Sequence, residues 1–238
     1  MLNTHKLIVA AAIAVAATSA HAGSITADYS FTLFGGVTFN ANLPGHVGSK
    51  SVNTALMHGE RTDLPAGVGV DSNVPKKFTA FCVEVGETIN NGSQTHANVL
   101  PLLGATTAPG GISGPVLFDA TRTKNLELLW GSYRASVVDV KSAAAFQLAE
   151  WEIAFDDDLT LTDNTQKLWV DDVSSGLYAK SEAWLSAIKN GNATSKQSLY
   201  LLQTQGVQDL VTPVPEPGTI AAIGIGAAGL LRRRARRN

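Results

Sequence analysis

After an apolar run at the N-terminus, apolar and polar side chains alternate over part of residues 24–42. Between residues 24 and 42, Tyr29, Phe31 and Leu33 share one face of an extended chain, and Gly35-Gly36 suits a turn. Such alternation is typical of half-buried strands, because successive side chains point to opposite faces of a sheet. We therefore predict a β-hairpin over these residues.

The segments that follow are less regular. Residues 43–75 are rich in Gly, Pro, Asn and Ser, which predicts loops with weak strands. Residues 77–89 contain aromatic and β-branched side chains and predict a strand, whereas residues 90–115 again have the composition of a loop. The first half of the chain is thus expected to contain strands joined by long loops.

Helical spacing of apolar side chains replaces alternation in the second half of the chain. It predicts helices over residues 123–134, 142–155, 166–174 and 177–189. Two short strands, 198–204 and 207–211, are then expected around Gly206. The predicted fold class is α+β: a β-rich sandwich or barrel-like domain with a helical block inserted before the last strands.

Residues 1–22 have the pattern of a secretory signal peptide. Lys6 precedes an uncharged apolar run over residues 7–17, and Ala20 and Ala22 form an A-x-A cleavage pattern. The run is too short to cross a bilayer core of about 30 Å as a helix. We predict that this segment is removed on export; the alternative is a buried N-terminal helix.

Residues 213–238 form a tail of three consecutive parts. Pro215, Glu216 and Pro217 come first, and the two prolines prevent a regular element from continuing, because they fix φ and lack a backbone donor. A short apolar helix is expected next, over residues 219–231. The chain then carries an arginine cluster, formed by Arg232, Arg233, Arg234, Arg236 and Arg237. Such a cluster stays on the cytoplasmic side of a membrane and stops translocation.

This order resembles the PEP-CTERM tail of Gram-negative envelope proteins. The resemblance implies recognition by an exosortase, cleavage near the Pro-Glu-Pro triplet and transient contact of the tail with the membrane. It also implies delivery to the cell envelope, the cell surface or the extracellular matrix. A plain C-terminal membrane anchor is the alternative, but the apolar stretch is short for a permanent span.

One domain, residues 23–212, lies between the two ends and is long enough to bury a core. Without the two terminal segments, the domain contains 12 Lys and Arg and 19 Asp and Glu. Its net charge is therefore −7, whereas that of the whole chain is −2. This balance argues against nucleic acid as a partner, because phosphate binding needs clustered Lys and Arg.

Cys82 is the only cysteine, so it has no partner for an internal disulfide. On a strand, Phe81, Val83 and Val85 share the more apolar face, whereas Cys82 shares the opposite face with Glu84. We therefore expect the thiol to point away from the main core. The alternative is a cysteine that acts only as a small buried hydrophobic residue.

Gln147 lies in the middle of the predicted helix 142–155, which is apolar nearly all round and therefore expected to be buried. Ala143, Glu150 and Trp151 neighbour it at three- or four-residue spacing. A buried amide without hydrogen-bond partners costs about 1–3 kcal/mol. We therefore expect this side chain to have a structural or a chemical role.

Two short motifs resemble those of the Cys–Gln thioester domains of bacterial surface proteins. The motifs are Phe81-Cys82-Val83, on the predicted strand, and Phe146-Gln147-Leu148-Ala149-Glu150-Trp151, on the predicted helix. The resemblance implies a β-rich fold with a helical subdomain and a bond from Cys82 Sγ to the side-chain carbonyl carbon of Gln147, formed with loss of ammonia. It also implies capture of an extracellular target that carries a nucleophile, either a protein amine or a polysaccharide.

The residue types suit this chemistry. A thioester is an activated acyl group, and proximity supplies most of what an unactivated amide lacks. Phe81, Phe146 and Trp151 are expected to shield the bond from water. Two positions depart from the Gram-positive pattern, with Phe146 in place of Thr and Glu150 in place of Ile. A buried glutamine beside a free buried thiol is therefore the alternative.

We predict no turnover enzyme, no cofactor and no metal site. The sequence has no Ser/His/Asp arrangement, phosphate-binding glycine loop or CxxC, and the acids between Asp156 and Asp163 lack the Gly and Glu of an EF-hand. The leading hypotheses are a surface protein that attaches through a thioester and a non-reactive structural protein of the envelope or matrix. A secreted hydrolase, which should have a cleft with perturbed carboxylates, is the third.

Overall fold

The computed structural model describes residues 23–63, 74–156, 158–174 and 176–214. The predicted signal peptide, and the sorting tail from residue 215 onward, lie outside the described residues. The strands are β1 (Gly23–Leu43), β2 (His46–Arg61), β3 (Lys77–Cys82), β4 (Gln94–Pro101), β5 (Leu168–Trp169), β6 (Leu199–Gln203) and β7 (Leu210–Pro213). The helices are α1 (Ala120–Tyr133), the short 3₁₀ helix η1 (Arg134–Ser136), α2 (Val140–Phe155) and α3 (Gly176–Lys189).

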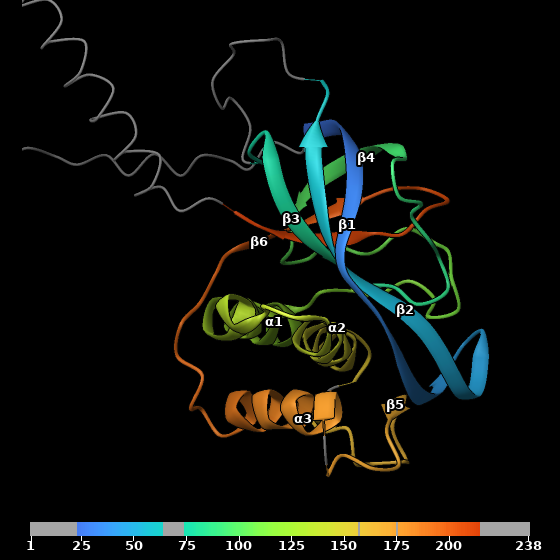
Figure 1. Ribbon diagram of the computed structural model, residues 1–238, viewed down its shortest axis with the longest axis vertical. Helices are drawn as coiled ribbons and strands as arrows, with labels where there is room; N and C mark the ends of the chain where they lie inside the picture. Colours follow the sequence, from blue (N-terminus) through green and yellow to red (C-terminus); the bar gives the residue numbers. More distant parts are fainter. Residues whose placement is uncertain (1–22, 64–73, 157, 175, 215–238) are drawn as a thin grey trace, which may run out of the picture.

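The strands form one antiparallel sheet in the order β2-β3-β7-β6-β4-β1-β5. Because β1 also pairs with β2, six of the strands form a closed circuit, which is a barrel. The helices α1, α2 and α3 come between β4 and β6 in the chain and cover one side of the sheet (Figure 1). The predicted class, a β-rich domain with an inserted helical block before the last strands, is therefore confirmed.

The first two strands differ from the prediction. The predicted hairpin turn at Gly35-Gly36 is wrong, because β1 runs on to Leu43 and turns at residues 44–45 into the equally long β2. The two glycines instead follow a β-bulge, since the register shifts between Thr32 and Gly35. Residues 43–75, predicted as loops with weak strands, thus contain one long strand, held to β1 by backbone pairing that composition does not reveal.

Three other segments also differ. The strand predicted over residues 77–89 ends at Cys82, and residues 90–115 contain β4 between β1 and β6. The helix predicted over residues 166–174 is wrong, because only β5 forms there. Its Leu168 N–H donates to the carboxylate of Asp156 at 2.7 Å, which holds the segment extended.

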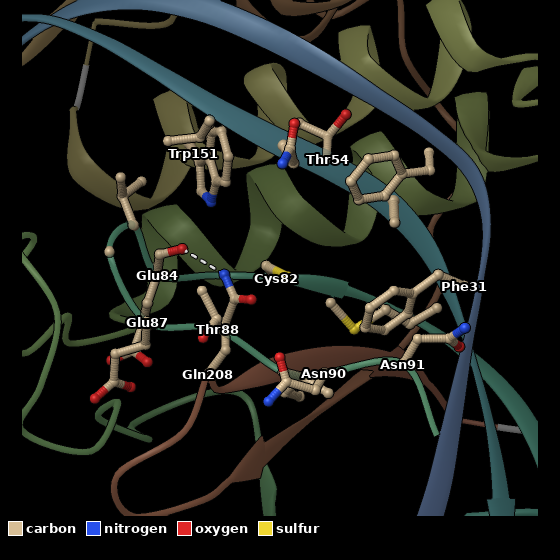
Figure 2. Close-up of a pocket in the computed structure, with 18 of the residues that line it drawn as sticks. Phe31, Thr54, Cys82, Glu84, Glu87, Thr88, Asn90, Asn91, Trp151 and Gln208 are labelled. Carbon is tan, nitrogen blue, oxygen red and sulfur yellow. Dashed lines mark hydrogen bonds between the residues drawn. The ribbon is translucent and has the colours of Figure 1, made fainter. Parts of the chain in front are cut away.

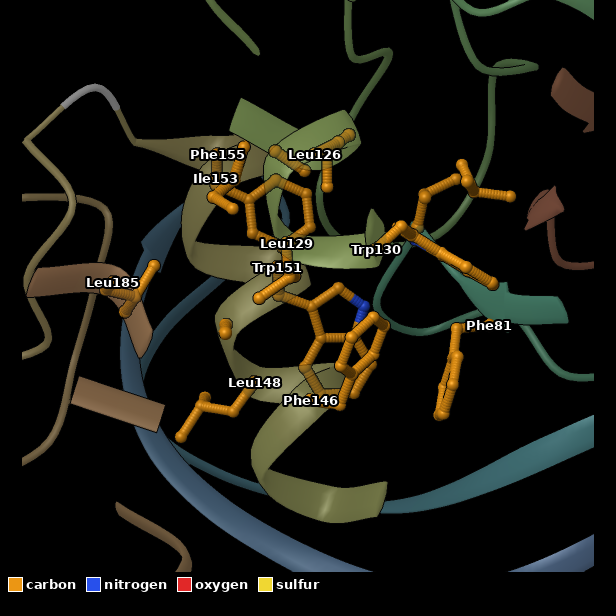
Figure 3. Close-up of a cluster of buried hydrophobic side chains, with 14 of the residues drawn as sticks. Phe81, Leu126, Leu129, Trp130, Phe146, Leu148, Trp151, Ile153, Phe155 and Leu185 are labelled. Carbon is orange, nitrogen blue, oxygen red and sulfur yellow. The ribbon is translucent and has the colours of Figure 1, made fainter. Parts of the chain in front are cut away.

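Helix α2 is the centre of the larger core. Its N-terminus is capped by Asp139, whose carboxylate accepts from the Ser142 N–H at 2.7 Å. From Ser142 to Phe155 every residue is buried, because α1, α3, β1 and β2 all pack against this helix. Figure 3 shows the aromatic and leucine side chains between α1 and α2. A second apolar cluster, which includes Ile25, Ala80 and Leu202, comes from the other face of the barrel strands.

The close approach of β2 and β3 at Gly59 gives a test of this packing. A Cβ at position 59 would collide with the ring of Phe78, which is buried and packs against Tyr29. We expect Gly59→Ala to destabilise the domain by about 1–3 kcal/mol, because the ring has to move within a packed core. Urea unfolding measures this difference.

Gly36→Ala is the matched control in the neighbouring strand. Its Cβ has only Val52 O nearby, at 3.8 Å, which is ordinary contact. We expect a much smaller change in the free energy of unfolding, and equal losses for both variants would contradict the packing described.

Candidate functional site

Cys82 and Gln147 meet, although 65 residues separate them in the chain. The backbone N–H of Cys82 donates to Gln147 Oε1 at 3.1 Å, and Gln147 Nε2 donates to the backbone carbonyl of Cys82 at 2.5 Å. The side-chain amide of Gln147 therefore pairs with the Cys82 backbone as the peptide group of a neighbouring strand would. Both polar groups of this fully buried side chain are satisfied.

The position of this contact follows from the ends of two strand pairings. β2 pairs with β3 only as far as Met57 and Ala80, so Cys82 has no β2 residue opposite it. On the other side, the Val83 N–H donates to Asp209 O at 3.1 Å, and Cys82 is aligned with Leu210. The Gln147 amide thus completes the hydrogen bonding of β3 at the point where β2 separates from it.

The side chains of β3 divide between two cores, as the alternation predicts. Phe81 and Val83 belong to the core that contains the helices. Cys82 belongs with Ala80 to the second cluster, and its side chain is 5% exposed. The thiol therefore points away from the larger core.

A cavity of about 540 Å³ opens beside the thiol. One wall is the β2 segment from Lys50 to Met57, and the opposite wall is formed by Cys82 and residues 84–91. Trp151 reaches it from α2, as Figure 2 shows, and Phe31, Phe34 and Gln208 complete the lining. Cys82 is thus almost fully covered by protein but lies at the edge of a space large enough for a ligand group.

Two buried carboxyl groups fix the wall of this cavity. Glu84 Oε2 accepts from the Asp209 N–H at 3.1 Å, and Asp209 accepts from the backbone N–H groups of Ala108 and Thr204. Gln208 Nε2 donates to the Glu84 carbonyl at 2.9 Å (Figure 2). These bonds join the end of β3 to the turn between β6 and β7.

The environment of these acids raises their pKa values. Burial raises the pKa of Glu84 to about 8, and the neighbouring charges of Asp209 and Glu87 act in the same direction. Burial likewise raises the pKa of Asp209 to about 6, against the effect of its two backbone donors. Asp209 is fully buried and does not line the cavity, so this pair supports the wall and does not present two carboxylates to a substrate.

The three predicted shielding residues occupy two places. Phe81 and Phe146 are both fully buried, with ring centroids 4.9 Å apart. Trp151 lies separately, packs against Phe39 and forms part of the cavity wall. Trp130 of α1, which no sequence motif indicates, lies with its ring edge-on to both Phe81 and Phe146 (Figure 3).

Glu150 of α2 is a buried carboxyl group close to the contact between Gln147 and Cys82. It is fully buried, and neither of its carboxyl oxygens has a hydrogen-bond partner among the described residues. Burial raises the pKa of Glu150 well above its usual value. The indole N–H of Trp130 lies near the carboxyl group and lowers this pKa in part, although the two groups do not have the geometry of a hydrogen bond. The pKa of the Cys82 thiol is raised by burial and, next, by the charges of Glu150 and Glu84.

Within the described ranges, no three His, Cys, Asp or Glu side chains are grouped so that they could hold a metal ion. Asp156, in the acidic segment after α2, is buried and binds the Lys167 and Leu168 N–H groups. None of the helices in the described part of the chain is long and apolar enough to cross a membrane. The apolar stretch 219–231 is outside that part.

Comparison with known families identifies the end of the chain. Residues 213–237 match the PEP-CTERM protein-sorting motif. The motif indicates an exported protein that an exosortase processes and that reaches the envelope or surface of a Gram-negative bacterium. Comparisons with curated proteins and with solved structures give no match. The resemblance of residues 23–212 to thioester domains therefore rests on the two motifs quoted above.

The carboxyl cluster predicts a dependence of stability on pH. Because the folded-state pKa values of Glu84 and Asp209 are raised, the folded protein holds protons that the unfolded chain has lost between about pH 4.5 and pH 8. The contribution of these two groups to stability is therefore most favourable below this window and falls as pH rises through it. We expect urea midpoints that decrease across the window and a shallower decrease in Glu84→Gln.

Glu60→Gln serves as the control, because the Glu60 side chain is 49% exposed on β2. It should leave the slope of stability against pH unchanged. A Glu84→Gln variant with the wild-type slope would show that Glu84 is not protonated in the folded protein near neutral pH.

Proposed function

We propose that this exported protein forms an internal thioester between Cys82 Sγ and Gln147 Cδ and uses it to attach covalently to a nucleophile outside the cell. The observation that carries the proposal is the pairing of the Gln147 amide with the Cys82 backbone. Proximity and orientation are the main requirements for a thiol to attack an unactivated amide.

The hydrogen bonds favour this attack. The Cys82 N–H donates to Gln147 Oε1, which is the oxygen that becomes negatively charged when sulfur adds to the carbonyl carbon. The S–Cδ bond forms, the Cδ–Nε2 bond breaks, and the nitrogen leaves as ammonia with the proton of the thiol. A later nucleophile reverses the roles: it bonds to Cδ, and the thiol of Cys82 leaves.

A stored acyl group has to be protected from water and still be reached by its target, and the surroundings of Gln147 and Cys82 suit both needs. Gln147 and Phe146 are fully buried, which keeps water from the bond. The cavity beside Cys82 provides a route by which a target group can approach. The target is a protein amine or a polysaccharide hydroxyl, and one molecule makes one bond without turnover.

The alternative is a non-reactive structural protein of the envelope or matrix. The same two hydrogen bonds support it, because they satisfy the Gln147 amide and replace the missing β2 partner of Cys82. In this case Gln147 acts as a permanent link between α2 and the barrel.

Intact mass of the exported protein separates the two. We expect the wild-type domain to be lighter than its sequence by one ammonia, and Cys82→Ala and Gln147→Ala each to have the full mass of their own sequences. Treatment with methylamine should open the thioester and increase the mass of the wild-type protein by that of one methylamine molecule. A wild-type protein of full mass, with a thiol that titrates after unfolding, would exclude the thioester and favour the structural alternative.

The tail is tested by replacing Pro215, Glu216 and Pro217 with alanine. We expect the wild-type chain to end near the triplet, because the matched sorting motif begins at residue 213. The variant should accumulate with its apolar stretch and arginines still attached, as measured by C-terminal peptide mapping of the membrane fraction. Processing of both proteins at the same rate would contradict a role for the triplet.

A further inference from the structure

The walls of the cavity beside Cys82 are edges of the chain and not faces of the sheet. A sheet face presents alternate residues, because successive side chains of a strand point to opposite sides. The cavity is instead lined by the consecutive residues 50–55 of β2 and, opposite them, by residues 84–91. Pairing of β2 with β3 stops at Met57 and Ala80, next to this space. The cavity therefore lies between two edges that would be neighbours if the sheet continued.

The backbone of β2 presents unused hydrogen-bonding groups to the cavity. Thr38 of β1 is aligned with Ser51, yet its N–H donates to Tyr178 Oη at 3.2 Å and its carbonyl accepts from the same hydroxyl at 2.9 Å. Opposed residues of an antiparallel pair either exchange both backbone bonds or turn both sets of groups outward. The N–H and carbonyl of Ser51 therefore face away from β1, as do those of Asn53 two residues later. Neither residue has a strand on that side in the described structure.

Two buried side chains at the cavity also have polar atoms without a partner. Trp151 is 2% exposed and Glu84 is 0% exposed. The Nε1–H of Trp151 and the Oε1 of Glu84 form no hydrogen bond among the described residues. Both residues line the cavity, and in Figure 2 the indole nitrogen of Trp151 is turned toward Gln208 and Cys82. Because unsatisfied buried polar atoms are costly, a ligand that supplies their partners is favoured.

The side chains along the cavity differ between its two faces. Val52 packs against the larger core, to which Trp151 belongs. Glu84 follows Cys82 by two positions and so continues the opposite face of β3. Glu87, which also lines the cavity, has a second carboxyl oxygen without a partner in the described residues. A strand that alternates apolar and basic side chains matches this division, because it presents one kind to each face.

We propose that the cavity binds an extended segment of a partner protein, which adds as a strand to the free edge of β2 and turns lysine or arginine side chains toward Glu84 and Glu87. Residues 50–55 span about 20 Å at ~3.3 Å per residue, so a segment of about six residues fits. Backbone bonds to Ser51 and Asn53 provide the affinity, and the two acids select the side chains. The site needs no covalent step and does not depend on the thioester.

The test measures binding of a fluorescein-labelled peptide of four Lys-Val repeats to the exported protein by fluorescence anisotropy. The Cys82→Ala variant is used, because it cannot form a thioester and failure of that proposal then leaves this measurement unaffected. We expect saturable binding. Methylation of the backbone nitrogens of either all lysines or all valines should weaken binding about tenfold or more for one of the two sets, since alternate N–H groups face β2. Both methylated peptides keep the charge of the parent peptide.

Asn53→Pro, made in the same protein, tests the edge of β2. It removes an N–H that faces the cavity but no bond to β1, so the fold should keep its near-ultraviolet circular dichroism, while binding weakens about tenfold or more. Val47→Pro is the matched control. Val47 is aligned with Asn42, whose N–H donates to Lys167 O, so its backbone also faces outward, but it does not line the cavity. It should bind the peptide as tightly as the parent protein.

Glu87→Gln tests the choice of side chains. We expect it to weaken binding of the Lys-Val peptide about threefold, because one carboxylate is lost beside the basic side chains. Glu60→Gln, on β2 but outside the cavity lining, removes the same charge and should leave the affinity unchanged. Equal weakening by both variants would show that the peptide responds only to the net charge of the domain and would overturn the assigned role of Glu87.

Three results overturn strand addition. The first is absence of binding by the Lys-Val peptide, and the second is equal binding by the parent peptide and both methylated forms. The methylated peptides decide the question even where Asn53→Pro fails to fold. The third is a dimer of the protein alone in analytical ultracentrifugation that Asn53→Pro abolishes and the peptide does not dissociate. In that case a second copy of this chain occupies the edge.

Discussion

The pairing of the Gln147 amide with the backbone of Cys82 is the contact on which the rest of the structure depends. A barrel whose strand β2 leaves its neighbour β3 early exposes one N–H and one carbonyl group at the point of separation. A side chain from α2 satisfies both, and this fixes the helix against the barrel. The cavity, the buried acids and the division between two cores are all arranged around that junction.

The junction also explains why the domain combines very apolar and very polar interior positions. Helix α2 is buried on all sides, so its polar residues have no route to water. Gln147 is fully satisfied, whereas Glu150 and Glu152 keep unpartnered oxygens within the described structure. The surrounding aromatic packing, such as Phe81 on Phe146, supplies the stability that tolerates these groups.

Sequence reasoning was reliable where one periodic pattern decides the element. The helix 142–155 and the opposite faces of Phe81 and Cys82 follow from spacing alone and agree with the structure. It underestimated β2, which was predicted as weak strands within loops and whose first half is held by pairing with β1 alone. The meeting of Cys82 with Gln147 was anticipated through motif resemblance, but no local pattern indicates that Glu84 reaches Asp209, 125 residues away.

Strand β7 ends at Pro213, the residue at which the matched sorting motif begins, and this has a mechanical consequence. In the proposed attachment at Gln147, tension between the partner and the C-terminus would pass through α2, β3 and β7, which the Gln147–Cys82 hydrogen bonds and the β3–β7 pairing connect. The last two are neighbours, with Cys82 aligned to Leu210, so the force is borne by a short antiparallel pair at the barrel wall.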